Sequence, residues 1–183
     1  MEKWDVYNEE GKRLEGELIR GEAIPKGQFH LVVQILVVHT DGSILVMQRD
    51  YEKESHPGEY EASAGGSVLK GETSKQGALR ELKEETGIEA EVKYIGSFIN
   101  DKRNSIFHQY ISVTDCAKES IVLQKGETIG YKWLSQDEFF EFICTDAFVQ
   151  RQRDKILSSK NRFMREIEDA LNGFMIHKHR LDK

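Results

Sequence analysis

Residues 65–90 read GGSVLKGETSKQGALRELKEETGIEA, and this stretch crowds three glutamates into little more than one helical turn. They are Glu81, Glu84 and Glu85. Like charges three or four residues apart on a helix repel one another, at a cost of roughly 0.2–0.5 kcal/mol per pair. The crowding therefore predicts a compensating partner, which is either a set of basic neighbours or a bound cation.

The same stretch predicts a loop followed by a helix. Thr73 or Ser74 can cap the start of the helix, and Gly87 stands where a left-handed residue would end it. The loop is expected to be irregular because it carries glycines at 65, 66 and 71. It should place backbone groups next to the carboxylates of the helix.

The helix is expected to have two distinct faces. Ala78, Leu79 and Leu82 recur at a spacing of three to four and form the face predicted to enter the core. At about 100° per residue the glutamates fall on an adjacent side. Gly77 lies among them, and we expect its missing side chain to leave space over the carboxylates.

The rest of the chain predicts strands on both sides of this helix and helices at the end. An N-terminal β-hairpin is expected over residues 4–19, followed by a strand at 30–39 that is apolar at nearly every position and so buried on both faces. The segment 43–49 is its expected hairpin partner, and a short strand at 60–64 should stop at Gly65. Further strands are expected at 91–100, 105–113 and 131–134, a helix after Ser135, and one broken or two consecutive helices from Asp146. This order indicates an α+β fold or an α/β/α sandwich.

Composition limits the classes of function. The 183 residues are 38% hydrophobic and 32% charged, with a net charge of −6, so a general affinity for nucleic acid or anionic lipid is not expected. The two cysteines, Cys116 and Cys144, are expected to be free thiols in a reducing cytoplasm. The N-terminal segment has no apolar core of a signal peptide and no stretch reaches a membrane-spanning length, so we expect a cytoplasmic protein.

Three interpretations of the glutamate cluster remain open at this point. It is a solvated face balanced by basic neighbours, a surface for a basic partner, or a site for Mg²⁺, which prefers oxygen ligands. The glycine-rich loop directly before the helix favours the metal site. A pair between Glu72 and Arg80 would fasten this loop to the helix.

The residues resemble the signature of the Nudix hydrolases. Gly66, five residues, Glu72, seven residues and then RELKEETGI at 80–88 fit every defined position of that signature. A looser resemblance extends over residues 30–134. It implies a Nudix α/β/α sandwich with a mixed sheet, here with an N-terminal hairpin at 1–26, a core at 27–145 and a helical extension at 146–183, all in one domain.

The resemblance also implies an activity and a set of site residues. The activity is Mg²⁺- or Mn²⁺-dependent hydrolysis of a nucleoside diphosphate linked to a group X. The implied metal ligands are Glu81, Glu84, Glu85 and the carbonyl of Gly65 or Gly66; Glu72 would be mainly structural or help bind a further metal. The general base is implied at Glu127, with Glu84 or Glu85 as the alternative, and Arg49 is a candidate for binding a phosphate or for an ordinary ion pair.

Other residues carry weaker indications. His30 and His108 lie in predicted strands, where packing is the more common role of a histidine. Tyr60, Phe107 and Tyr110 could stack on a base, but aromatic residues in strands mostly belong to the core.

The N-terminal half looks most similar to the Nudix branch near isopentenyl-diphosphate isomerase. Gly65 stands where that isomerase has a catalytic cysteine, so isomerase activity is not expected. A catalytically silent ligand sensor is the alternative to the hydrolase. The partner expected is a small diphosphate, without nucleic acid or membrane, and a homodimer is possible.

Overall fold

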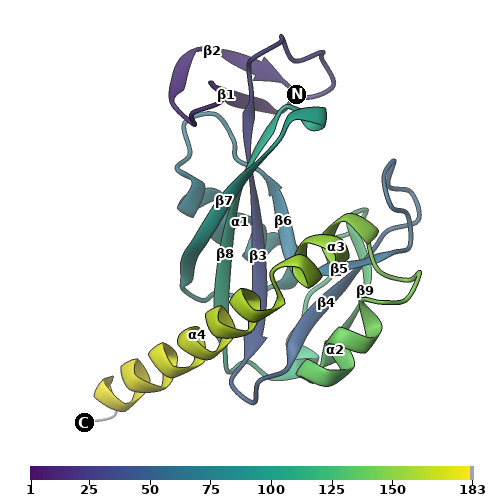
Figure 1. The fold of residues 1–183 in the computed structure, drawn as a ribbon, viewed down its shortest axis with the longest axis vertical. Coiled ribbons are helices and arrows are strands. Elements are labelled where there is room, and N and C mark those ends of the chain that lie inside the picture. The colour runs from purple at the N-terminus through teal and green to yellow at the C-terminus, as the bar shows by residue number, and fades with distance from the viewer. Residues whose placement is uncertain (182–183) are drawn as a thin grey trace.

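The computed structural model describes residues 1–181 and contains a mixed β-sheet between helices. Helix α1 lies behind the sheet in the view of Figure 1, and α3 and α4 cross its near face. A separate two-stranded sheet, formed by the N-terminal hairpin, sits at the opposite end of the molecule from α2. The mixed sheet, the N-terminal hairpin and the C-terminal helices expected from the sequence are therefore all present.

The elements follow the chain in a β-rich, helix, β-rich, helical order. The strands are β1 (Lys3–Tyr7), β2 (Arg13–Ile19), β3 (His30–His39), β4 (Ile44–Arg49), β5 (Tyr60–Ala62), β6 (Ala64–Ser67), β7 (Val92–Asn100), β8 (Ser105–Thr114) and β9 (Thr128–Leu134). The α-helices are α1 (Ser74–Thr86), α2 (Gln136–Phe142), α3 (Gln150–Ser158) and α4 (Lys160–Leu181). Single 3₁₀ turns occupy Asp101–Arg103 and Lys118–Ser120.

Strand β3 is the centre of the sheet, and its two faces feed two hydrophobic clusters. Val33 and Ile35 pack with Leu82 of α1 on one side. Leu36 on the opposite face packs with Phe139 of α2. A strand covered on both faces needs apolar residues at consecutive positions, which explains the unbroken apolar run.

The predicted hairpin between β3 and β4 was wrong over most of its length. The two strands pair only at Val38 and Ile44, next to the turn. One edge of β3 is occupied by β8 in parallel, and the other edge is taken by β6 at residues 32–35. Because a strand has only two edges, β4 diverges and pairs with β9 and β5 instead.

The predicted break at the glycine pair was also wrong. Gly65 and Gly66 belong to β6 and pair with Gln34 and Val33. The interruption falls two residues earlier, at Ser63, whose φ is +55°. Its hydroxyl accepts a hydrogen bond from the Val37 backbone N–H and donates one to a carbonyl of β4, both at 2.8 Å, so the kink is anchored to the two neighbouring strands.

The hairpin β1–β2 is tied to the loop that precedes α1. The backbone N–H of Lys70 donates to the Lys3 carbonyl at 2.8 Å, and that of Gly71 donates to the Asp5 carboxylate at 2.9 Å. These bonds hold in place the loop that carries Glu72. The C-terminal segment forms two helices, with the interruption at Ser159.

Candidate active site

Helix α1 begins and ends where its sequence predicts. Thr73 and Gln76 form a reciprocal capping box, and Gly87 ends the helix with a φ of +74°. Ala78 and Leu82 are fully buried, which fixes the rotation of the helix about its axis. Glu81 and Glu85, one turn apart, consequently point toward β6, and both are buried.

Arg80 connects the loop to the helix, as the sequence suggested. Its guanidinium donates two hydrogen bonds to Glu72, at 2.9 and 3.0 Å, and a third to the Ser67 carbonyl at 3.0 Å. The Nη1 atom lies between Glu81 and Glu84, at 2.7 and 3.1 Å from their oxygens. The Arg80 hydrogen bonds lower the pKa of Glu72, which holds this carboxylate ionised.

The negative charge of Glu85 is compensated far less than that of Glu72. Within residues 1–181 the Glu85 carboxylate accepts one hydrogen bond, from the Gly65 backbone N–H at 2.9 Å, while Glu61 and Glu81 lie near enough to repel it. Burial and then this repulsion raise the pKa of Glu85 well above its usual value. Burial likewise raises the pKa of Glu81. The two carboxylates favour either a proton or a cation.

Gly66 makes the close approach of strand and carboxylate possible. A Cβ at this position would overlap the Glu81 carboxylate, so only glycine leaves that carboxylate where it lies. The expectation that Gly77 opens this space was wrong. A Cβ on Gly77 would meet Val68 at 3.1 Å and Glu72 at 3.5 Å, so Gly77 packs against the loop.

A cavity of about 310 Å³ opens beside the glycine strand. It is lined by Arg49, Gly65, Gly66 and Glu61, with His30 and Phe107 also contributing. Arg49 forms an ion pair with Glu61 at 2.5 Å, so both interpretations of Arg49 apply: it is paired, and it faces the cavity next to the carboxylates.

Glu127, the predicted general base, lies in the loop before β9. Its carboxylate forms an ion pair with Lys53 and contributes to the repulsion felt by Glu85. The structure thus places Glu127 in the electrostatic neighbourhood of the helix carboxylates. Its catalytic role stays a prediction.

The weaker candidates have structural partners. His30 stacks on Trp4 with ring centroids 4.1 Å apart, and burial lowers its pKa to about 4. His108 and Tyr110 both hydrogen-bond to the Ser74 hydroxyl, at 2.9 and 2.7 Å. Tyr60 hydrogen-bonds to Gln48 at 3.2 Å. Cys116 and Cys144 are free, as expected.

The donors suit a hard cation, although Arg80 already pairs with two of the carboxylates. Within residues 1–181 no group of three or more His, Cys, Asp or Glu side chains is gathered closely enough to hold a metal ion. Glu81 and Glu84 instead share Arg80 Nη1. Glu84 is 46% exposed, so its side chain is free to turn from Arg80 toward an ion beside Glu85.

Sequence reasoning missed Glu61 and its partner on α3, Gln152. Glu61 accepts from Arg49 and from the amide of Gln152, at 2.5 and 3.1 Å. Among the neighbouring charged groups, Glu61 raises the pKa of Glu85 most. The sequence signal for Glu61 was a charged residue inside the short strand YEA. The sequence carries no signal for Gln152, because only the fold brings α3 to β5.

The comparisons with known proteins bear on the fold and the family. A family model described as NUDIX domain matches residues 28–157. This chain belongs to the NUDIX domain family. An "Uncharacterized Nudix hydrolase" of Listeria monocytogenes is 34% identical over 151 residues, which cover 81% of this chain and 89% of that protein. The prediction of a Nudix-type hydrolase is confirmed at the level of the family.

Solved structures show the same fold at low identity. The protein DR0079 of Deinococcus radiodurans superimposes with a TM-score of 0.67 at 21% identity, covering 81% of this chain and 92% of its own. A bifunctional NMN adenylyltransferase/ADP ribose pyrophosphatase of Francisella tularensis, complexed with AMP and a Mn ion, superimposes with a TM-score of 0.56 at 21% sequence identity. The match covers 74% of this chain and 42% of that one. The Nudix α+β fold is therefore confirmed. No helix within residues 1–181 is both long and apolar enough to cross a membrane.

Proposed function

We propose that this Nudix protein is a Mg²⁺-dependent hydrolase of a diphosphate linkage in a nucleoside diphosphate derivative, which it cleaves to a nucleoside monophosphate and phosphorylated X. The observation that carries the proposal is the pair of buried carboxylates, Glu81 and Glu85, held against the side-chain-free Gly66. Buried carboxylates of raised pKa are costly without a cation. A divalent metal held by these carboxylates would offset that cost.

Each residue of the site has a distinct task in this proposal. Glu81, Glu84 and Glu85 hold the metal together with the carbonyl of Gly65 or Gly66, and Glu72 keeps Arg80 and the loop in position. The bound metal would neutralise the diphosphate oxygens and lower the pKa of the attacking water.

Two further residues complete the proposal. Arg49, fixed by Glu61, faces the cavity where a phosphate oxygen would lie. Glu127 accepts the proton from the attacking water, with Glu85 as the alternative acceptor. The AMP and Mn ion in the Francisella tularensis structure support a nucleotide substrate and a divalent metal.

Kinship with the isopentenyl-diphosphate isomerase branch is part of the proposal, without its activity. Gly65 stands at the position of the isomerase cysteine, and a Cβ there would lie 2.5 Å from the Val33 carbonyl oxygen. A cysteine side chain has no room at this point of β6. We also propose that the chain forms one domain. We further propose that it forms a homodimer, which sedimentation of the purified protein tests.

The experiment is phosphate or nucleotide release from a panel of diphosphates, with Mg²⁺ and with EDTA, for wild type and Glu84→Gln. We expect metal-dependent turnover that falls by about a thousandfold in the variant, because several kcal/mol of charge stabilisation is lost. Glu89→Gln, which changes an exposed glutamate paired with Lys83, is the control and should keep wild-type turnover. Unchanged turnover in folded Glu84→Gln would refute the assignment, and tight binding without turnover would favour the sensor.

A further inference from the structure

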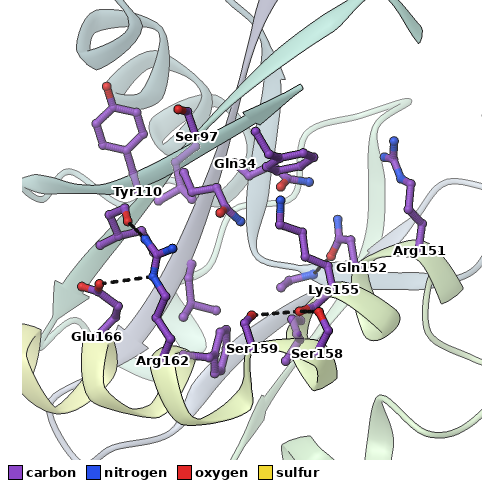
Figure 2. A pocket seen from close by; sticks show the side chains of 18 residues that line it. Gln34, Ser97, Tyr110, Arg151, Gln152, Lys155, Ser158, Ser159, Arg162 and Glu166 are labelled. Atoms are coloured by element: carbon purple, nitrogen blue, oxygen red, sulfur yellow. Dashed lines mark hydrogen bonds and ion pairs between the residues drawn. The ribbon is translucent and has the colours of Figure 1, made fainter. Parts of the chain in front are cut away.

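A second cavity, of about 420 Å³, continues the first on the face of the sheet that α3 and α4 cover. It lies between β3, β7 and β8 on one side and α3 and α4 on the other (Figure 2). The two cavities share Gln34, Arg151 and Gln152. They therefore form one groove that starts at the glycine strand β6 and runs away from the carboxylates.

The register of the sheet gives the length of this groove. Ser67 pairs with Val32, Val32 with Phe107, and Phe107 with Phe98, which makes a row across four adjacent strands. Neighbouring strands are about 4.8 Å apart. Phe107 is thus about 10 Å, and Phe98 about 14 Å, from the residue that follows Gly66. The far end of the groove is therefore two to three strand spacings from the glycine strand.

Two cations of α3 lie over the far end of that row. The Arg151 guanidinium is 5.4 Å from the centroid of the Phe107 ring, and the Lys155 ammonium lies over Phe98. The two rings stack on each other with centroids 4.7 Å apart. Figure 2 shows both cationic side chains rising from α3 toward the sheet, one helical turn apart.

This basic end of the groove is poorly compensated. In residues 1–181 neither Arg151 nor Lys155 forms an ion pair with a carboxylate, and Arg151 Nη1 is buried without a hydrogen-bond partner. Arg103 at the rim adds a third positive charge. The neighbouring arginines differ, because Arg153 pairs with Asp154 and Arg162 with Glu166.

The surroundings already oppose the positive charge. Burial, and then the repulsion of Arg103, lower the pKa of Arg151, and the attraction of the Glu61 carboxylate offsets only part of this. Burial and the repulsion of Arg151 lower the pKa of Lys155 to about 8. Contacts with the two aromatic rings offset part of this cost but leave Arg151 Nη1 without an acceptor. An anion in the groove would supply that acceptor.

We propose that Arg151 and Lys155, with Arg103 at the rim, form an anion subsite that binds a second phosphate group of the substrate, about 10–14 Å from the glycine strand at which the diphosphate would be cleaved. The inference rests on the proposed function, and it narrows the substrate to diphosphates whose nucleoside or X group carries an additional phosphate. Arg151 and Lys155 are then specificity-determining residues, remote from the metal.

The first test is binding of inorganic phosphate to the full chain in EDTA, measured by calorimetry for wild type, Arg151→Gln and Lys155→Gln. We expect the affinity to fall about tenfold or more in both variants, as the loss of a charge-assisted hydrogen bond predicts. Arg151→Lys keeps the charge and should retain part of the affinity. Arg153→Gln, on the same helix but paired with Asp154, is the matched control and should bind as wild type does.

The second test compares kcat/KM for pairs of diphosphates that differ only by the additional phosphate, on the nucleoside ribose in one pair and on X in another. Wild type should prefer the phosphorylated member of one pair, and that pair identifies where the substrate carries its additional phosphate. Arg151→Gln should remove this preference but hydrolyse the members that lack the additional phosphate at the wild-type rate. Equal phosphate affinity in wild type and Arg151→Gln, or no preference in wild type, would overturn the inference. Arg151-dependent phosphate binding without any turnover would leave the subsite standing and refute the hydrolase.

Discussion

The two ends of the groove carry opposite charges that are arranged in opposite ways. At the β6 end, Arg80 is satisfied by Glu72, Glu81, Glu84 and a backbone carbonyl, while Glu85 is left with a single N–H. At the α3 end, Arg151 has no carboxylate partner within the described part of the chain, residues 1–181. One end is built around a fixed cation and has surplus negative charge, whereas the other has positive charge without a partner.

The charged groups at the two ends therefore affect the stability of the ligand-free protein in different ways. Removing one partner of a buried ion pair is costly, because it leaves the other charge buried and unpaired. An uncompensated charge costs stability until a ligand arrives, which is a common property of functional sites. Arg80 belongs to the first kind, and Glu85 and Arg151 to the second.

The largest effect is expected from Arg80. Arg80→Gln should lower the free energy of unfolding by about 3 kcal/mol, because it leaves several carboxylates without their common partner. Denaturant unfolding in EDTA measures the change. Arg151→Gln is the comparison variant and should cost less than about 1 kcal/mol. Similar losses in the two variants would contradict the distinction between the two ends.

Gly66→Ala should separate activity from stability. The added Cβ displaces the Glu81 carboxylate, the mobile end of a side chain, so kcat/KM should fall about a hundredfold with little change in the unfolding midpoint. Gly65→Ala meets a backbone carbonyl instead and should destabilise the protein. Gly173→Ala, with open space around it, is the control for the substitution itself. Full activity in Gly66→Ala would show that the position of Glu81 is not critical.

The smallest effect concerns the pH dependence of the metal-free protein. The pKa of Glu85 is higher in the folded than in the unfolded chain, so the folded state binds more protons between those two values. Stability in EDTA should therefore decrease as the pH rises from about 4.5 through the folded pKa. Glu85→Gln should remove this decrease and gain about 1 kcal/mol at neutral pH. A wild-type unfolding curve that is insensitive to Glu85→Gln at pH 7 would contradict the assigned burial cost.

The carboxylate end could be predicted from sequence because it is local. Glu72, Arg80 and the three glutamates lie within 14 residues, and helical periodicity together with the capping residues places them on known faces. The resemblance to the Nudix signature then supplied their roles. The sequence predicts a loop at the glycine pair because glycine usually interrupts a strand; in the structure the pair permits close backbone approach between β6, β3 and α1.

The basic end could not be predicted, because it is assembled by the topology. Arg103 follows β7, while Arg151 and Lys155 lie on α3 about 50 residues later. Only the parallel pairing of β3 with β8 and the passage of α3 over the sheet bring them to one groove. In the sequence Arg151 and Lys155 belong to the basic segment RQRDK at 151–155, whose composition is typical of a solvated surface. For the same reason the sequence does not indicate that Gln152 contacts Glu61.

The central claim, that the glutamates of α1 bind a divalent cation, is tested most directly by titrating the full chain with Mn²⁺ and following the relaxation of water protons. The account predicts saturable binding to wild type that weakens by at least about tenfold in Glu84→Gln, while Arg151→Gln binds Mn²⁺ as wild type does. Equal Mn²⁺ affinity in wild type and Glu84→Gln would contradict it.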